Sequence, residues 1–306
     1  MTRHIHITEV GPRDGLQNEK QMIDTAVKVE LCNRLLAAGV QNLEATSFVS
    51  PKWVPQMADA PQVMAQVNRI AGRIYSVLTP NLRGFEAALA SGASEVVIFG
   101  AASEAFSQRN INCSIAESIN RFSEVAVAAK QNNIRLRAAV SVAFGCPYQG
   151  DVPVSSVVNV VERFRDMGCD EIGIADTIGV ATSGQVRTVM QAAARVYAIE
   201  QISGHFHDTY GQGVVNALAC VESGVSRLDS SIAGLGGCPY AKGATGNVAT
   251  EDMVYMLHGM GYSTGLDLNL LIATGQWVSQ HLGRKSSSRA GNAMAAKWAA
   301  QTERAA

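Results

Sequence analysis

The chain has 306 residues, of which 47% are hydrophobic and 17% are charged, so it can bury a sizeable core and is not expected to be disordered. Its formal net charge is −1, and this near-neutral balance argues against nucleic acid or an anionic membrane as a partner. An anionic small molecule stays compatible, because it needs only a few local basic side chains.

Eight short runs of strand-forming residues follow one another along the chain, separated by stretches with helical periodicity. Strands that alternate with helices in this way indicate βαβ units and a parallel sheet. The strands are predicted at residues 4–9, 42–46, 74–78, 95–99, 135–142, 171–175, 201–207 and 227–232. The clearest helices are predicted at residues 25–38, 83–91, 115–131, 154–167, 183–197 and 213–222.

A glycine follows the end of several predicted helices, at Gly39, Gly92, Gly168 and Gly224. Glycine just past a helix end adopts the left-handed conformation without a clash from a Cβ atom. The repeated order of helix, glycine, short link and strand is what an eight-fold barrel needs. A doubly wound open sheet would also alternate, but eight units favour closure. We therefore predict an α/β fold of the (β/α)8 TIM-barrel type.

The region after the eighth strand begins with a Gly-rich loop at residues 234–246, followed by a helix near residues 249–259. The tail from residue 266 to residue 306 is mostly helical by composition, and it is too short and too polar at its end to form a core of its own. We predict one domain over residues 1–306. The barrel occupies about 1–260, and a C-terminal helical appendage at about 261–306 packs on it or serves as a dimer element.

Polar side chains cluster at the predicted C-terminal ends of the strands, where TIM barrels carry their active sites. Such a set of sequence-distant polar groups at one end of a barrel is hard to explain as packing. They are Arg13, Asp14, Glu44, Asp176, His205, His207, Asp208, Cys238, Asn247 and Glu251.

The sharpest local signal is the pair His205 and His207, because residues two apart on a strand point to the same face. A lone His-x-His is commonly structural, but Asp14 and Asn247 can reach the same mouth. Carboxylate, amide and imidazole donors without sulfur suit a six-coordinate Mg²⁺ or Mn²⁺ better than structural zinc. We predict a divalent-metal site of Asp14, His205, His207 and Asn247.

Arg13 stands beside Asp14, so the two can form a local ion pair, or one can face the metal and the other the substrate. A guanidinium is always charged and suits an oxygen that gains negative charge in a transition state. Glu44 and Asp176 are compatible with two roles, as counter-ions to Arg13 or as groups that orient water or a substrate hydroxyl. The sequence leaves these alternatives open.

Cys238 lies in the Gly-rich loop, whose five glycines predict mobility. A lid that brings an acid or a thiol to the site is the more economical interpretation, and the alternative is an anion-binding loop with an incidental cysteine. The other cysteines are scattered without a CxxC pair, so disulfides and thiolate zinc are not expected. Cys146, in a second Gly-Cys-Pro-Tyr, is expected only to line the mouth.

No targeting signal of a familiar kind is present. No apolar run approaches the roughly 18 residues of a membrane span. The start, MTRHIHITEVGPRDG, lacks the apolar region of a secretory signal and the Arg- and Ser-rich pattern of an organellar leader. We expect a cytoplasmic protein.

Long stretches of the chain resemble the 3-hydroxy-3-methylglutaryl-CoA (HMG-CoA) lyase family, within the wider DRE-TIM metallolyases. The resemblance covers nearly everything but the last forty or so residues. The stretches are residues 10–20 (VGPRDGLQNEK), 44–59 (EATSFVSPKWVPQMAD), 98–111 (IFGAASEAFSQRNI), 176–180 (DTIGV), 205–212 (HFHDTYGQ) and 234–257 (GLGGCPYAKGATGNVATEDMVYML).

The resemblance implies a role for each site residue. Asp14, His205, His207 and Asn247 would bind the divalent cation, and Arg13 would stabilise the enolate of departing acetyl-CoA. Cys238 would act from the loop, and Asn18 and Lys20 would help to hold coenzyme A. Glu44, Asp176 and Glu251 would be active-site carboxylates. The family's members are commonly dimers, which implies a homodimer here.

The reaction implied is cleavage of an HMG-CoA thioester to acetoacetate and acetyl-CoA, with His205 favoured as the base and Asp176 as the alternative. Strands five and six depart from the family's pattern at residues 141–146 and 171–176, which puts the acyl substituent in doubt. The alternatives are a lyase for longer 3-hydroxy-3-alkylglutaryl-CoA substrates, a Claisen condensing enzyme like isopropylmalate synthase, a biotin-type carboxyltransferase barrel and a non-catalytic barrel. A condensing enzyme of this kind usually carries a large regulatory extension, for which the chain is expected to be too short. A carboxyltransferase barrel would need a lysine suited to carbamylation beside the metal, and a non-catalytic barrel should have lost some of the mouth residues; neither is seen in the sequence.

Overall fold

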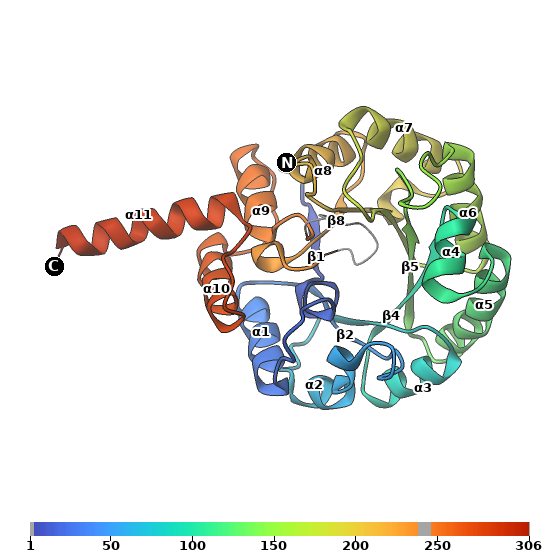
Figure 1. The fold of residues 1–306 in the computed structure, drawn as a ribbon, viewed down its shortest axis with the longest axis horizontal. Coiled ribbons are helices and arrows are strands. Elements are labelled where there is room, and N and C mark those ends of the chain that lie inside the picture. Colours follow the sequence, from blue (N-terminus) through green and yellow to red (C-terminus); the bar gives the residue numbers. More distant parts are fainter. Residues whose placement is uncertain (1–2, 238–245, 306) are drawn as a thin grey trace.

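Eight parallel strands close into a barrel in the order in which they occur in the chain (Figure 1). The computed structural model describes residues 3–237 and 246–305. The last strand pairs with the first in parallel, with His6 opposite Arg227 and Glu9 opposite Ser230, and this pairing closes the sheet. The predicted TIM barrel is confirmed. The strands are β1 (His6–Glu9), β2 (Asn42–Ser47), β3 (Ile74–Leu78), β4 (Glu95–Ala101), β5 (Arg135–Ser141), β6 (Glu171–Asp176), β7 (Ile202–Phe206) and β8 (Arg227–Ser230).

Helices surround the barrel on its outside (Figure 1), and the six that the sequence predicts most clearly are confirmed. The helices are α1 (Thr25–Ala37), α2 (Ala60–Gln66), α3 (Leu82–Ala90), α4 (Glu104–Ile111), α5 (Ile115–Gln131), α6 (Val154–Asp166), α7 (Ser183–Ala193), α8 (Gly213–Glu222), α9 (Thr250–Gly259), α10 (Leu268–His281) and α11 (Arg289–Ala305). No helix in the described part of the chain has the length and apolarity to cross a bilayer.

The main difference from the predicted boundaries is at α7, which ends at Ala193, short of the predicted end at residue 197. Tyr197 is buried, and its hydroxyl donates to the carbonyl of Cys169 at 2.6 Å. The chain must leave the helix early to bring this ring back to the barrel wall. Tertiary packing therefore sets the end of α7 where helical periodicity alone would extend it.

The glycines that follow α1, α3, α6 and α8 have the left-handed conformation that the sequence predicts, with φ of +98°, +72°, +85° and +108°. At Gly39 a second constraint applies, because an added Cβ atom would lie 2.4 Å from the carbonyl oxygen of Gly265. This glycine therefore allows the link after α1 to lie in close contact with the backbone at the start of the C-terminal appendage.

An ion network fills part of the barrel interior, where TIM barrels commonly carry branched apolar layers. Arg137 on β5 lies 3.0 Å from Glu171 on β6 through Nε, and 2.6 Å from Asp229 on β8 through Nη2. All three side chains are buried. The network lies below the C-terminal ends of the strands, so it forms the floor of the barrel mouth.

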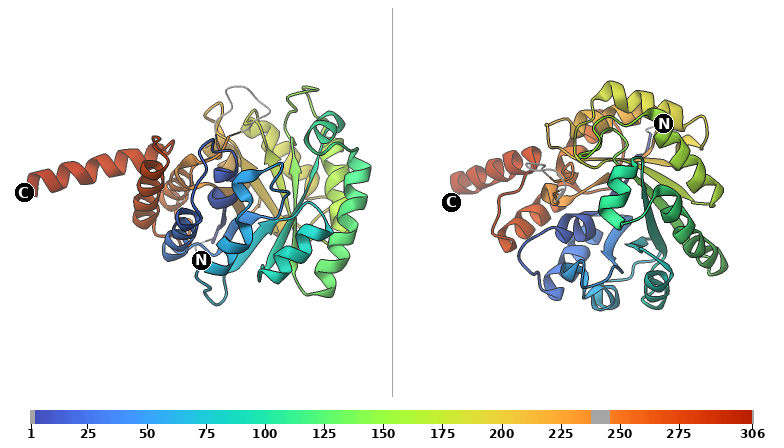
Figure 2. Two further views of the ribbon diagram at one scale, coloured as in Figure 1. Left: turned by 60° about the horizontal axis from the view of Figure 1, so that its bottom comes forward. Right: turned by 45° about the vertical axis from the view of Figure 1, so that its right-hand side comes forward.

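The C-terminal appendage has two helices with different surroundings. Helix α10 packs beside α1 and α9, whereas α11 projects away from the barrel (Figures 1 and 2). The direction of α11 is fixed at its start, where the buried Asp252 carboxylate accepts hydrogen bonds from the hydroxyl of Ser288 at 2.7 Å and from the backbone N–H of Ala290 at 2.7 Å. The helix is therefore anchored firmly at one end only.

Candidate functional site

Three of the four predicted metal ligands meet at the barrel mouth. One ligand atom from each of Asp14, His205 and His207 lies within 4.8 Å of the others. Asn247 joins them, because its backbone pairs with that of His207 and its amide nitrogen donates to Asp14 Oδ2 at 2.8 Å. Residues more than 230 positions apart in the sequence, Asp14 and Asn247, are thus in direct contact.

The turn after β1 explains how Asp14 reaches the mouth. Residues Gly11–Gly15 form one turn of π-helix, in which the N–H groups of Arg13, Asp14 and Gly15 all converge on the carbonyl of Val10. Glycine is needed at the start, because a Cβ atom on Gly11 would lie 2.6 Å from a carboxylate oxygen of Glu9. The wide turn aims two consecutive side chains at the same opening, and π-turns of this kind are frequent at functional sites.

The two histidines come from β7 and the residue after it. Their rings lie on the same face with centroids 5.4 Å apart, as their spacing of two predicts. His207 is buried, and His205 is partly buried. Nδ1 of His205 lies 3.1 Å from Oδ2 of Asp229. That contact leaves Nε2 as the nitrogen of His205 that is available to a ligand at the mouth.

Arg13 is held by two carboxylates. Its Nε and Nη2 atoms each lie 2.9 Å from an oxygen of Glu44, and its Nη1 donates to Asp14 Oδ1 at 2.6 Å. Of the two roles that the sequence leaves open for Glu44, the described contacts show the ion pair with Arg13. A guanidinium has five N–H donors, so these three contacts leave donors for a substrate oxygen. Glu44 thus orients the group that the sequence predicts to meet the developing charge.

The charges of the site favour an ionised Asp14. Burial by itself would raise the pKa of Asp14, but the nearby Arg13, His205 and His207 outweigh it and hold that pKa far below its usual range. For His205, burial would lower the pKa, but the hydrogen bond to Asp229 and its negative charge raise it instead. The carboxylate donor is therefore ready for a cation at neutral pH.

Asp176 occupies a different environment at the end of β6. Its carboxylate accepts hydrogen bonds from the N–H groups of Val180 and Ala181, each at 3.0 Å, and so caps the loop that follows. Its described contacts are to this loop and not to Arg13. Burial raises the pKa of Asp176 to about 6, although the backbone N–H groups and the charge of His205 oppose that shift. A buried carboxylate with a pKa near neutrality is suited to general acid–base work.

Glu251 lies one layer behind the mouth, on α9. It is buried, and both of its oxygens accept from the N–H of Ala233, at 3.2 and 3.0 Å. Ala233 has φ of +56°, a left-handed conformation that costs energy for a residue with a Cβ atom. Glu251 therefore supports the strained turn from which the Gly-rich loop departs.

Replacing Glu251 with glutamine is expected to change the pH dependence of stability. Burial raises the pKa of Glu251 from 4.5 to about 8, so the folded protein binds a proton more tightly than the unfolded chain does. This stabilisation is present below pH 4.5 and is lost as the pH rises towards 8. Denaturant unfolding at pH 5 and pH 8 should therefore favour Glu251→Gln over the parent at the higher pH, by at least about 1.4 kcal/mol. An unfolding free-energy difference that is equal at both pH values contradicts this assignment.

The remaining predicted site residues lie around the rim. Asn18 is exposed and donates to the carbonyl of Gly237 at 2.9 Å, and Lys20 is exposed close by in the sequence. Cys238 lies outside the described residues. Cys146 is buried and accepts a hydrogen bond from Ser103 at 3.1 Å.

Two acidic residues close to the site were missed by the sequence analysis. Asp229 bonds to His205, and Glu9 accepts hydrogen bonds from the N–H groups of Gly11 and Ile232 at 2.8 and 2.9 Å. Burial raises the pKa of Glu9 to about 7. Glu9 thus links the turn that carries Asp14 to the turn after β8. A usable signal existed for both, because each is an acidic residue inside a predicted strand.

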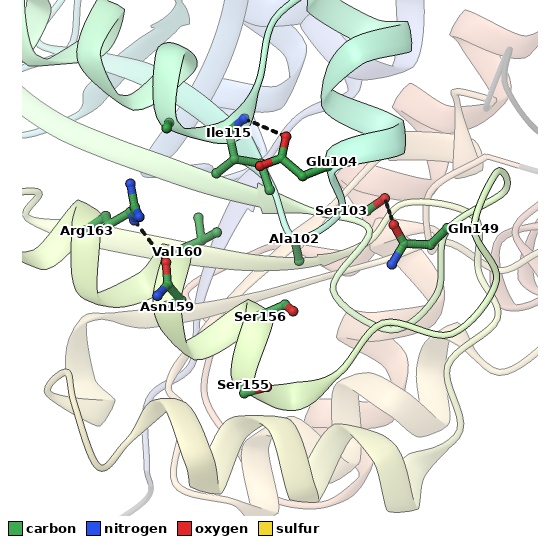
Figure 3. Close-up of a pocket in the computed structure, with 11 residues that line it drawn as sticks. Ala102, Ser103, Glu104, Ile115, Gln149, Ser155, Ser156, Asn159, Val160 and Arg163 are labelled. Carbon is green, nitrogen blue, oxygen red and sulfur yellow. Dashed lines mark hydrogen bonds between the residues drawn. The ribbon is translucent and has the colours of Figure 1, made fainter.

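A hollow of about 490 Å³ has a lining that is separate from this cluster (Figure 3). It is lined by the first residues of α4 and α5 and by the stretch of α6 from Ser155 to Arg163. Figure 3 shows Glu104 bonded to the N–H of Ile115 and Arg163 bonded to Asn159. None of its lining residues is a predicted site residue. The hollow therefore adds nothing to the chemistry at the mouth.

The donor set fits a hard divalent cation. It offers a carboxylate held ionised, two imidazoles and an amide, without a thiolate among the described residues. One adjustment is needed, because the amide of Asn247 turns its nitrogen towards Asp14 and also donates to the carbonyl of Leu235 at 3.2 Å. Asn247 would have to turn its amide to offer Oδ1 to a metal. The residues present fit Mg²⁺ or Mn²⁺ on this basis.

Comparisons with known proteins agree over nearly the whole chain. A family model described as HMGL-like matches residues 4–278. A mitochondrial hydroxymethylglutaryl-CoA lyase of Arabidopsis thaliana is 55% identical over 95% of this chain, which spans 62% of that relative's length. A 3-hydroxy-3-isohexenylglutaryl-CoA/hydroxy-methylglutaryl-CoA lyase of Pseudomonas aeruginosa is 52% identical over 97% of this chain and 99% of its own.

The solved structures give the same result for the fold. The crystal structure of hydroxymethylglutaryl-CoA lyase from Pseudomonas aeruginosa superposes with a TM-score of 0.95 at 52% identity, covering 97% of this chain and 99% of that one. Carboxyl transferase domains of a pyruvate carboxylase share the fold at 16–17% identity with TM-scores of 0.69–0.70. At that distance the likeness concerns the barrel alone.

Proposed function

The chain belongs to the HMGL-like family, and from this premise and the geometry of the mouth we propose that it is a divalent-metal-dependent carbon–carbon lyase. It cleaves (S)-3-hydroxy-3-methylglutaryl-CoA to acetoacetate and acetyl-CoA. The observation that carries the proposal is the convergence of Asp14, His205 and His207 within 4.8 Å beside a partly buried arginine, Arg13. A cation held by the cluster can bind the substrate hydroxyl, and Arg13 can hold the oxygen of the departing thioester.

Two positive charges are proposed for this site, a divalent cation near the substrate hydroxyl and the guanidinium of Arg13 near the thioester oxygen. Asp14, His205, His207 and Asn247 would hold Mg²⁺ or Mn²⁺, which would lower the pKa of the substrate hydroxyl. Arg13, oriented by Glu44, places its remaining N–H donors towards the thioester oxygen, which becomes negative as the bond breaks. Arg13 therefore acts while the carbon–carbon bond is breaking, and this lowers the barrier to cleavage itself.

Asp176 is the better candidate for the base. His205 has Nδ1 bonded to Asp229, so its single available nitrogen, Nε2, cannot serve both a metal and a proton. Asp176 takes the proton from the C3 hydroxyl, the C2–C3 bond breaks, and its electron pair remains on the thioester as an enolate. C3 becomes the ketone of acetoacetate. The enolate carbon then takes a proton, for which we propose Cys238 as the donor, and becomes the methyl group of acetyl-CoA.

The pH dependence of turnover tests the role of Asp176. A base must be ionised, so kcat/KM is expected to rise with pH through a pKa of about 6 and then to level off. Replacing Asp176 with asparagine should lower kcat/KM by about 10²–10⁴-fold and remove this limb of the profile. If kcat/KM of Asp176→Asn still rises with pH as in the parent, the titrating group is another residue, and His205 is the first to test.

The proposed activity is tested directly with the purified protein, Mg²⁺ or Mn²⁺ and HMG-CoA. Acetyl-CoA and acetoacetate should appear in equal amounts as HMG-CoA disappears. A protein that leaves HMG-CoA intact with either metal present would contradict the proposal. Release of free CoA from acetyl-CoA and a 2-oxo acid would instead indicate the condensing activity of the alternative enzyme class.

A second candidate substrate is a 3-hydroxy-3-alkylglutaryl-CoA with a longer side chain. The Pseudomonas aeruginosa relative is named for both the isohexenyl and the methyl substrates. On the strand β5 of this chain, the positions that follow Arg137 on the interior face are Ala139 and Ser141, which are small and partly exposed. Comparing kcat/KM for the methyl and isohexenyl thioesters decides between them, and a ratio above about 100 for the methyl substrate would exclude the broader activity.

Coenzyme A is proposed to be held by Asn18 and Lys20 at the rim. Replacing Lys20 with alanine should raise KM for the thioester roughly 2–5-fold with kcat nearly unchanged, because an exposed ion pair contributes about 0.2–1 kcal/mol. The effect should shrink as salt is added. Lys52, which is also exposed on the neighbouring loop, gives a matched control variant with an unchanged KM. Equal effects at both positions would indicate general attraction and not a CoA contact.

We further propose that residues 1–306 act as one unit, in a cytoplasmic homodimer without nucleic-acid or membrane partners. The projecting helix α11 supports an oligomer, because helices in proteins are stabilised mostly by tertiary packing and much of α11 extends away from the barrel. Light scattering should give a mass of twice the chain's 32.4 kDa. Truncation before α11 should shift the measured mass towards that of a single chain. A monomer for the full chain would contradict this assignment.

A further inference from the structure

We propose that Asp229, held in place by Arg137, is a positioning residue that fixes the ring of His205 for metal binding. The inference rests on the proposed metal site and adds two residues to it that do not touch the metal. Asp229 is 6% exposed and Arg137 is 4% exposed, so both charges are buried within the barrel. Neither belongs to the set of side chains that converge at the mouth.

The contacts of Asp229 leave it one orientation. Its two oxygens lie 2.6 and 2.8 Å from Nη2 of Arg137, and Oδ2 also lies 3.1 Å from Nδ1 of His205. Arg137 is itself restrained by Glu171 at 3.0 Å and by the hydroxyl of Ser203 at 3.0 Å. Four adjacent strands, β5 to β8, thus supply a continuous chain of contacts that ends on the imidazole.

The chemistry of imidazole explains why this series of contacts matters for metal binding. A neutral ring has one N–H and one free lone pair, and the hydrogen bond made by one nitrogen decides which nitrogen binds a metal. A carboxylate can only accept, so Nδ1 of His205 must donate to Asp229. The lone pair is then on Nε2, the nitrogen left available at the mouth beside Asp14 and His207.

Stability alone does not account for the network. Buried ion pairs often stabilise a fold no better than apolar side chains of similar volume. TIM barrels commonly fill this interior with branched apolar residues. A buried arginine and aspartate that end on a ligand histidine are explained when the aspartate sets the tautomer and angle of that ring.

The isosteric variant Asp229→Asn gives a specific test. Arg137 has no acceptor, so it should hold the oxygen of the introduced amide, and the nitrogen of that amide then faces His205. Nδ1 of His205 must then accept, and the proton moves to Nε2. Binding of Mn²⁺ without substrate, followed by electron paramagnetic resonance, should weaken by about 10–100-fold. Adding Arg137→Met to this variant frees the amide to turn and should restore much of the affinity.

Controls separate this inference from the proposed function and from misfolding. Ser203→Ala removes another contact of Arg137 and should leave Mn²⁺ affinity within about twofold of the parent. Nitrogen NMR of the parent without metal, assigned with a variant that lacks His205, should show the neutral ring protonated at Nδ1, and this measurement needs no Asp229 variant. If the parent binds no Mn²⁺, the proposed metal site fails. If the parent binds and its neutral His205 carries the proton on Nε2, or Asp229→Asn binds equally well, the positioning role is overturned.

Discussion

Replacing Arg13 with glutamine is expected to lower kcat by at least about 10²–10³-fold, the usual cost of removing one preorganised donor from a developing oxyanion. The structure gives the reason, because Glu44 holds two nitrogens of Arg13 at 2.9 Å and thereby aims the remaining donors. Glutamine lacks both the charge and the reach. Turnover measured at saturating HMG-CoA, with Mn²⁺ affinity measured in parallel, tests this expectation.

Two comparisons keep the Arg13 result interpretable. Arg13→Lys retains the charge but not the forked geometry, so it should recover only part of the activity. Thermal unfolding should be followed as well, because loss of Arg13 leaves the buried Glu44 without its partner. A folded Arg13→Gln protein with near-normal turnover would remove Arg13 from the chemistry.

Replacing His207 with alanine is expected to abolish tight Mn²⁺ binding and to lower kcat/KM by about 10³-fold or more, since a metal acting on a hydroxyl contributes several kcal/mol. His207 lies with Asp14 and His205 in the cluster of ligand atoms within 4.8 Å. Titration of the variant with Mn²⁺ and assay across the same metal range measure both effects. A matched control is His281→Ala, an exposed histidine on α10 that should change neither quantity. Full activity in His207→Ala at micromolar Mn²⁺ would exclude it as a ligand.

The barrel could be predicted because its signals are local and repeated. Strand and helix periodicity recur eight times, and Gly39 and Gly168 mark helix ends where a left-handed residue is needed. The boundary of α7 could not be predicted in the same way, since it depends on a hydrogen bond from Tyr197 to the carbonyl of Cys169, 28 residues earlier in the chain. Local propensity carries no information about such a contact.

The mouth-facing ligands of the candidate site were predicted from the sequence, and two of the acidic residues that support them were missed. His205 and His207 are visible because a spacing of two on a strand defines a face. Asp229 and Glu9 escaped notice because their roles depend on which strands are neighbours and on register, as in the alignment of His205 with Asp229. Glu251 illustrates the same limit, since its placement behind Ala233 follows from how α9 packs after the loop.

The measurement that tests the central claim most directly is acetoacetate release from HMG-CoA before chelation, after removal of divalent metal, and after metal is restored. The account predicts release by the purified protein, its loss in chelator, and its recovery when Mg²⁺ or Mn²⁺ is added back in excess. Release that continues undiminished in a metal-free protein would contradict the claim that Asp14, Asn247 and the two histidines act through a shared cation.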